Sequence, residues 1–112
     1  MSEIIYTIEK SLDVSEFIEV LKNSTLAERR PVDDAQRISS MCNNANLIVT
    51  ARLDGKLIGV ARSITDFVYC TYLSDLAVDL EYQKKGIGKK LIEETKKIAP
   101  QAKLILLSAP DA

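Results

Sequence analysis

Glycines and lysines gather in the segment "QKKGIGKK", which runs from Gln83 to Lys90. Gly86 and Gly88 stand one residue apart, where an apolar pattern typical of a helix begins. The first N–H groups of a helix lack partners inside the helix and carry partial positive charge. Glycine permits positive φ and lets an anion approach the backbone closely, so that successive N–H groups can converge on it. The segment therefore predicts a phosphate or pyrophosphate site, surrounded by lysine side chains.

Two common phosphate motifs fit this segment less well. A P-loop needs four residues between its glycines and a Ser or Thr after its lysine, whereas Lys90 follows Lys89 here. The Rossmann fingerprint needs a third glycine where Leu91 stands, and it usually belongs to the first strand–helix turn of a chain. The remaining alternative is an ordinary helix start with incidental glycines and a solvated lysine face.

The elements around this segment predict a mixed sheet with three helices. A β-branched run predicts a first strand at 4–8, and the apolar spacing from Val14 predicts a helix that ends near residue 24. A second helix is expected from Asp33 or Asp34 up to "NNAN" at 43–46. Two apolar runs at 46–53 and 56–64 flank Asp54-Gly55, a pair favoured in tight hairpin turns.

The second half of the chain predicts a strand–helix–strand unit. We expect a fourth strand at 70–78, a helix from Gly86 to Ala99 and a fifth strand at 103–108. The fourth and fifth strands should be parallel, as in other units of this kind. The order β-α-α-β-β-β-α-β makes residues 1–112 one domain of the α/β class, more closely described as an α+β mixed sheet.

Composition and charge exclude several classes of function. The 112 residues carry a formal net charge of −1, so the chain has no overall basic field for nucleic acid or a membrane surface. No apolar run approaches about 20 residues, so no membrane span is expected. The acidic start "MSEIIYTIEK" does not read as a signal peptide, so the expected location is the cytoplasm.

Histidine is absent, which excludes a histidine base and any Cys-His pair. Cys42 and Cys70 lie far apart, and neither has a second cysteine at the spacing of metal ligands. We therefore expect no metal site, and we predict two reduced, buried thiols of a cytoplasmic protein.

The segment "DLAVDLEYQKKGIGKKLIEE" resembles the acyl-CoA motif of the GCN5-related N-acetyltransferase (GNAT) superfamily. In that motif, Gln/Arg-x-x-Gly-x-Gly/Ala follows the fourth strand, and Gln83, Gly86 and Gly88 match its defining positions. The order of elements, with two helices between the first and second strands, also resembles the family over essentially the whole chain. The resemblance implies a GNAT-like acyl-CoA N-acyltransferase fold, with acetyl-CoA as co-substrate and no metal.

The resemblance also implies where CoA binds. Main-chain N–H groups from Gln83 to Gly88 would hold the pyrophosphate, and the backbone of 76–78 would pair with the pantetheine arm like an added strand. The fourth strand must then separate from the fifth, which a bulge near Asp75 or Leu76 would produce. The implied cofactor-binding residues are Leu76, Ala77, Val78, Gln83, Lys84, Lys85, Gly86, Ile87, Gly88 and Lys89.

The implied reaction is attack by a primary amine, from a small molecule or a protein, on the acetyl-CoA thioester. The N–H group of Leu76 or Val78 is expected to stabilise the oxyanion that forms. The general base is open among a water chain and three carboxylates, Asp75, Asp66 and Glu81.

Asp75 and Tyr72 are the candidate catalytic residues. Asp75 lies beside the expected acetyl position, and Tyr72, together with Tyr69, is expected near the amine. Ordinary alternatives are an ion-paired carboxylate and packed aromatic rings. Three arginines, at 29, 30 and 62, are expected either to recognise an acidic group of the substrate or to serve as surface charges.

The chain departs from the family pattern after the expected fifth strand. The family continues with another helix, which normally carries a tyrosine that protonates the leaving thiolate, and usually with two more strands. We therefore expect an N-acetyltransferase or, alternatively, a catalytically impaired acyl-CoA-binding remnant. A weaker third possibility is an interaction module whose lysine-rich helix meets an acidic partner. The edge of the fifth strand leads us to expect a homodimer that covers it.

Overall fold

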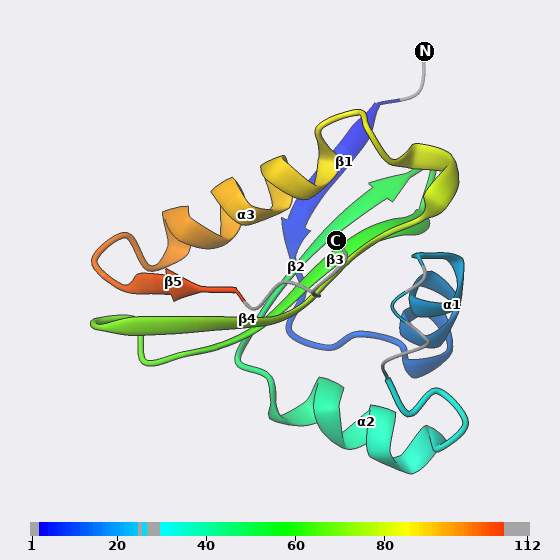
Figure 1. Ribbon diagram of the computed structural model, residues 1–112, viewed down its shortest axis with the longest axis horizontal. Coiled ribbons are helices and arrows are strands. Elements are labelled where there is room, and N and C mark those ends of the chain that lie inside the picture. Colours follow the sequence, from blue (N-terminus) through cyan, green and yellow to red (C-terminus); the bar gives the residue numbers. More distant parts are fainter. Residues whose placement is uncertain (1–2, 25, 27–29, 107–112) are drawn as a thin grey trace.

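The structure is a computed structural model that describes residues 3–24, 26 and 30–106. Its strands form one sheet in the order β1-β2-β3-β4-β5, with α1 and α2 on one face and α3 on the other (Figure 1). The strands are β1 (Ile4–Ile8), β2 (Leu47–Leu53), β3 (Lys56–Thr65), β4 (Cys70–Val78) and β5 (Lys103–Ile105). The helices are α1 (Val14–Ser24), α2 (Ala35–Asn44), α3 (Ile87–Ile98) and a short 3-10 helix, η2 (Leu80–Tyr82).

The predicted mixed sheet is confirmed in its order and directions. The β1–β2, β2–β3 and β3–β4 pairs are antiparallel, and β4 pairs with β5 in parallel. Asp54 and Gly55 have φ values of 51° and 85°, the positive values that a type I′ hairpin turn requires. Arg29 and the end of the predicted fifth strand, 107–108, lie outside the described residues.

Two apolar layers hold the helices to the sheet. On one face, Phe17 and Leu21 of α1 and Ile38 of α2 pack over buried residues of β2 and β3. On the other face, Ile87 and Leu91 of α3 pack over the same strands and β4. At Gly59 of β3 the helix comes very close, because an added Cβ would lie 3.2 Å from side-chain atoms of both Ile87 and Leu91.

The β3–β4 pairing contains a bulge in the middle of β4. Arg62 lies opposite Asp75, whereas the next residue of β3, Ser63, lies opposite Leu73. Ser74 is therefore the extra residue of β4, immediately before the predicted position at Asp75 or Leu76. A bulge bends and twists its strand, so β4 changes direction at this point.

One prediction about the cysteines is wrong. Cys42 is buried in α2, and this burial raises the pKa of its thiol above the ordinary value. Cys70 is exposed, because it begins β4 at the end of the sheet that extends past α2 (Figure 1). Both cysteines are free thiols.

Candidate functional site

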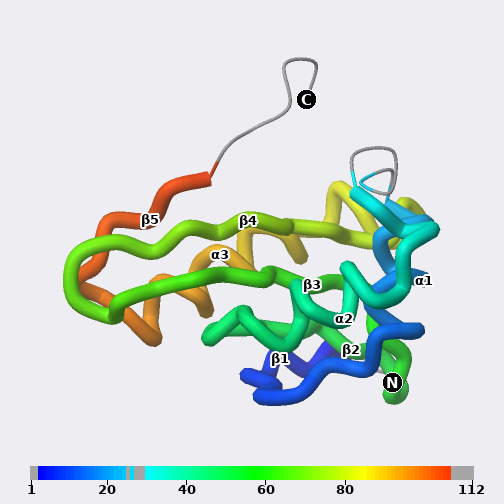
Figure 2. The backbone as a smooth tube through the Cα atoms, turned by 90° about the horizontal axis from the view of Figure 1, so that it is seen from below, coloured from blue at the N-terminus to red at the C-terminus, as the bar shows by residue number. Residues whose placement is uncertain are grey.

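An open edge of β4 is the first component of the candidate site. Within the part of the chain that the structure describes, pairing between β4 and β5 ends at Tyr72 and Ile105. Figure 2 shows β5 diverging from β4 toward the end of the described residues. Among the described residues, the second half of β4, from Leu73 to Val78, therefore pairs only with β3.

The direction of the β4 amides follows from their hydrogen bonds. The N–H group of Asp79 donates to the carbonyl of Ile58 in β3 at 2.8 Å. Because successive residues of an antiparallel strand point their main-chain groups to opposite sides, Leu76 and Val78 direct theirs away from β3. These two residues therefore present main-chain donors and acceptors to the open edge, where an extended ligand can pair with them.

A sharp turn joins the open edge of β4 to α3. The side chain of Asp79 accepts a hydrogen bond from the N–H of Glu81 at 2.9 Å, which caps η2. Two residues of the turn, Lys84 and Gly86, have positive φ values of 64° and 84°. Where residues in right-handed and left-handed helical conformations alternate, successive N–H groups point toward one place and form a concave anion site.

The beginning of α3 adds further donors to this turn. The first helical hydrogen bond runs from the N–H of Lys90 to the carbonyl of Gly86, at 3.0 Å. The N–H groups of Ile87, Gly88 and Lys89 precede this bond and lie in the first turn, where helix geometry provides no partner. Gly86 itself caps the helix without a side-chain hydrogen bond.

The two glycines have different roles, which corrects the expectation that both serve the turn through positive φ. Gly86 takes the left-handed conformation, whereas Gly88 lies within α3. A Cβ added at Gly88 would lie 3.8 Å from Val78 and 4.0 Å from Leu76, which is ordinary contact. Packing against β4 therefore does not require a glycine at this position, and Lys84 supplies the second positive φ.

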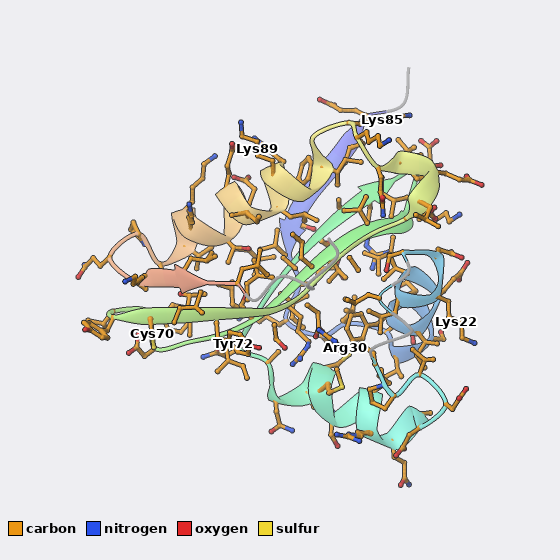
Figure 3. The ribbon with its side chains drawn as sticks, in the orientation of Figure 1. Lys22, Arg30, Cys70, Tyr72, Lys85 and Lys89 are labelled. Carbon is orange, nitrogen blue, oxygen red and sulfur yellow. The ribbon has the colours of Figure 1, made fainter. Side chains whose placement is uncertain are left out.

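The lysines around the turn differ in their surroundings. Lys84, Lys85 and Lys89 are exposed, and Figure 3 shows Lys85 at the turn and Lys89 on the solvent side of α3. The ammonium of Lys85 lies 5.6 Å from the centre of the Tyr82 ring. Lys90 extends instead toward β1, where its ammonium lies 5.9 Å from the ring centre of Tyr6. Lys90 therefore belongs to the packing of α3 rather than to the turn.

Gln83 links the turn to the open edge. Its side-chain amide donates to the carbonyl of Val78 at 2.8 Å. This carbonyl is one of the outward-facing groups of β4, so Gln83 ties the start of the turn to the end of the strand.

The candidate base Asp75 lies in a buried group of charges. Its side chain is 0% exposed, and its two oxygens accept hydrogen bonds from the guanidinium groups of Arg30 and Arg62. Figure 3 shows Arg30 beside the middle of β4. If Asp75 took up a proton, at least one of these ion pairs would be lost, which weighs against its use as a base. Its assignment as a catalytic residue stays a prediction.

The other candidate groups are more exposed. Tyr72 is 38% exposed at the last β4 position that pairs with β5, and Tyr69 is 80% exposed in the β3–β4 connection. One oxygen of Asp66 accepts main-chain hydrogen bonds from three residues of this connection, and the strongest effect, from Tyr69, lowers the pKa of the carboxyl. Glu81 lies on η2 and is exposed.

The described residues contain neither a metal-ligand group nor a membrane-spanning helix. Among the described residues, no three His, Cys, Asp or Glu side chains come together to form a metal site. None of the helices in the described part of the chain is long and apolar enough to cross a bilayer.

A mixed sheet that opens beside β4, followed by a glycine turn at a helix start, is the arrangement expected from the resemblance to the GNAT acyltransferases. The model of the Acetyltransferase (GNAT) family matches residues 14–111, which is most of the chain. The chain therefore belongs to the GNAT family.

Solved structures support the same fold. A GNAT family acetyltransferase from Streptococcus pneumoniae TIGR4 is 16% identical and has a TM-score of 0.82, over 96% of this chain and 77% of that chain. The aminoglycoside N-acetyltransferase AAC(6')-Iy in complex with CoA is 15% identical, with a TM-score of 0.76, over 99% of this chain and 80% of that chain. A ribosomal-protein-alanine N-acetyltransferase from Brucella melitensis is 21% identical, with a TM-score of 0.74, over 96% of this chain and 82% of that chain.

One curated relative is similar over a shorter stretch. The chloroplastic GCN5-related N-acetyltransferase 2 of Arabidopsis thaliana is 46% identical over 39 residues. This match covers 35% of the chain and 15% of the relative.

Proposed function

We propose that the chain is an acetyl-CoA-dependent N-acetyltransferase, which transfers an acetyl group to a primary amine of a small molecule or a protein. The observation that carries the proposal is the continuity between the open edge of β4 and the anion-binding turn at Gly86. An extended ligand with a diphosphate at one end fits this arrangement. Membership of the GNAT family supports acetyl-CoA as that ligand.

Different groups of the proposed binding residues would contact different parts of CoA. The N–H groups from Gln83 to Gly88, with the following Lys89, would hold the pyrophosphate, with partial positive charge from the start of α3. Leu76 to Val78 would pair with the pantetheine arm. Lys84 and Lys85, exposed at the turn, can supply additional charge to the phosphates. The hydrogen bond from Gln83 to the Val78 carbonyl would then be shared with, or replaced by, a pantetheine amide.

In the proposed reaction, the amine nitrogen attacks the thioester carbonyl carbon and forms a C–N bond. The carbonyl oxygen becomes an oxyanion, which the outward N–H of Leu76 or Val78 can stabilise. The C–S bond then breaks, the nitrogen loses a proton, and the thiolate of CoA takes up a proton. Alignment of two bound reactants supplies several kcal/mol of the barrier reduction.

The contacts of the predicted candidates bear on which group deprotonates the amine. Asp75 is ion-paired with two arginines, and Asp66 serves the main chain of the β3–β4 connection. These contacts disfavour the two aspartates, so we propose either a water chain or the exposed Glu81 as the base. We propose that Tyr72, which pairs with Ile105 at the inner end of the opening, contacts the amine.

The acceptor is proposed only as a class. Among the similar structures, one is an aminoglycoside N-acetyltransferase and another a ribosomal-protein-alanine N-acetyltransferase. These names cover a small-molecule amine and a protein, so both classes belong in a substrate screen. We also propose a cytoplasmic location, which suits the two free thiols.

The test combines CoA affinity with acetyl transfer. Calorimetry should detect CoA binding to the wild-type chain, and thiol release from acetyl-CoA should depend on an added primary amine. In Gly86→Val, the side chain disfavours positive φ, so CoA affinity should fall about 10- to 100-fold, as expected for one or two lost charge-assisted hydrogen bonds.

Gly55→Val is the matched control. Gly55 and Gly86 have φ values of 85° and 84°, and an added Cβ meets nothing within 4 Å at either position. Both variants therefore carry the same backbone strain, but only Gly86→Val should lose CoA affinity. CoA binding without turnover would favour the acyl-CoA-binding remnant, and the absence of CoA binding to the wild-type chain would reject both functions.

A further inference from the structure

We propose that Arg30, Arg62 and Asp75, here called the bulge clamp, position the β4 bulge and thereby aim the N–H group of Leu76 at the thioester. This inference rests on the proposed function. It gives Asp75 a positioning role, distinct from that of a general base.

The clamp holds the bulged residue directly. Arg30 Nη2 donates to the main-chain carbonyl of Ser74 at 2.9 Å, and Arg62 Nη2 donates to the hydroxyl of Ser74 at 3.1 Å. Asp75 accepts from both arginines. Ser74 is thus hydrogen-bonded at its carbonyl by Arg30 and at its side chain by Arg62. Both guanidinium groups also bind the carboxylate of Asp75.

The two arginines come from different parts of the fold. Arg30 belongs to the connection between α1 and α2, whereas Arg62 belongs to β3 and also donates to the Met41 carbonyl of α2 at 3.1 Å. The clamp therefore fixes the bulge relative to the neighbouring strand and to the helical layer. This arrangement leaves the bulge little freedom to shift its register.

Burial and the planar geometry of the guanidinium groups both restrict the movement of the clamp. Asp75 is 0% exposed and the Arg62 side chain is 8% exposed, whereas the Arg30 side chain is 22% exposed. Two fork-shaped donors on one buried carboxylate restrict both distance and direction, because each guanidinium is planar.

The position of the bulge determines which β4 amides face the open edge. In the observed register, the N–H of Leu76 points away from β3, two residues beyond the bulged Ser74. If the bulge were lost, the register between β3 and the part of β4 beyond it would slip by one residue, and the N–H groups that now face the open edge would face β3 instead. A donor for the oxyanion requires this direction to be fixed before the substrate binds.

The decisive variant is Arg62→Lys, which keeps the positive charge but removes the fork. We expect kcat to fall about 100-fold, the effect of a displacement near 1 Å in a reacting group. The Kd of CoA should change less than about twofold, because the pyrophosphate turn lies beyond the bulge and makes a large share of the contacts. Two smaller changes, Ser74→Ala and Arg30→Lys, should lower kcat less and provide folded alternatives if Arg62→Lys unfolds.

Arg52→Lys is the matched control. Arg52 of β2 also binds two carboxylates, those of Glu9 and Glu16, at 2.8 Å and 2.7 Å, but this group lies beside β1 and α1. Both Arg→Lys variants should lower the melting temperature, but Arg52→Lys should keep the wild-type kcat.

Hydrogen exchange supplies a measurement that does not depend on turnover. The amides of Asp75 and Ala77 face β3, and their exchange should accelerate in the clamp variants but not in Arg52→Lys. Unchanged kcat and unchanged exchange in the folded clamp variants would overturn the clamp, even if the wild-type chain is a good acetyltransferase. A wild-type chain without CoA binding would instead reject the proposed function, while exchange would still report whether the clamp holds the bulge.

Discussion

Asp66 organises the β3–β4 connection through a single carboxylate oxygen. This oxygen accepts main-chain hydrogen bonds from Val68, Tyr69 and Cys70 at 2.9, 2.8 and 3.0 Å. The connection carries exposed aromatic residues at the end of the sheet where β4 pairs with β5, and Phe67 has a positive φ of 67°. Through these hydrogen bonds, the side chain of Asp66 favours one conformation of the connection.

These hydrogen bonds predict a defined pH dependence for the connection. They lower the pKa of Asp66 below its ordinary value of 3.8. A lowered pKa in the folded state means that the stabilisation is complete above 3.8 and is lost as the pH falls through the lower, folded value. Amide NMR signals of Val68 and Tyr69 should therefore shift in acid, with a midpoint below 3.8. Asp66→Asn should remove this titration, and a midpoint above 3.8 would contradict the assignment.

The carboxylate of Asp75 predicts a larger effect on stability. Asp75→Ala leaves Arg62 buried without its ion-pair partner, and loss of one partner of a buried pair costs about 3–5 kcal/mol. Urea unfolding should report a decrease of this size in the free energy of unfolding. Glu16→Ala is the comparison, because the more exposed ion pair between Glu16 and Arg52 should contribute about 1 kcal/mol or less. Equal losses in both variants would show that burial is not the deciding factor.

At the scale of elements, α3 depends on the absence of a side chain at Gly59. The helix must lie close to the sheet for its first turn to meet the end of β4. In Gly59→Val, the new side chain would collide with Ile87 and Leu91, whose atoms lie 3.2 Å from an added Cβ. We expect the free energy of unfolding to fall by about 1–3 kcal/mol, as in other overpacked cores. CoA affinity should fall as well, because the start of α3 moves.

Gly88→Ala is the control for the stability part of this prediction. Its Cβ would lie 3.8 Å from Val78, so it should fold with little loss. Isothermal titration with CoA and urea unfolding on the two variants measure both effects. A Gly59→Val chain with wild-type stability and affinity would mean that α3 has more freedom to move than its contacts indicate.

Much of the arrangement of elements was predictable from local patterns. The Asp54-Gly55 turn and the strand–helix–strand unit each follow from short-range sequence signals, so the hairpin and the parallel pair were predicted correctly. The partners of Asp75 were not predictable in this way. Arg30 is 45 residues away and reaches it only through the packing of the α1–α2 connection on β4. The positive φ of Lys84 was missed because lysine has no preference for that conformation.

At the scale of the whole molecule, the β5 end of the sheet has an apolar surface that we propose is covered by a second copy. Ile64, Tyr72 and Ile105 are 49%, 38% and 43% exposed. They are direct neighbours across β3, β4 and β5, so their side chains lie on one face. Tyr69 and Val68, in the adjoining β3–β4 connection, are also exposed, at 80% and 64%. Within the described residues, the outer edge of β5 pairs with no strand, which leaves its main-chain groups available to another chain.

Sedimentation equilibrium tests this homodimer directly. We expect the wild-type chain to be dimeric at micromolar concentration, and Ile105→Lys to shift it toward monomer, because a charge would then be buried at the contact. Ile5→Lys is the matched control, since Ile5 is a comparably exposed isoleucine, at 51%, on β1 at the opposite edge of the sheet. Dissociation by Ile5→Lys alone would place the contact on β1 instead. A monomeric wild-type chain would exclude a dimer at either edge of the sheet. If only Ile105→Lys dissociates the dimer, the contact adjoins Tyr72, and the second copy lies next to the opening where the amine is proposed to enter.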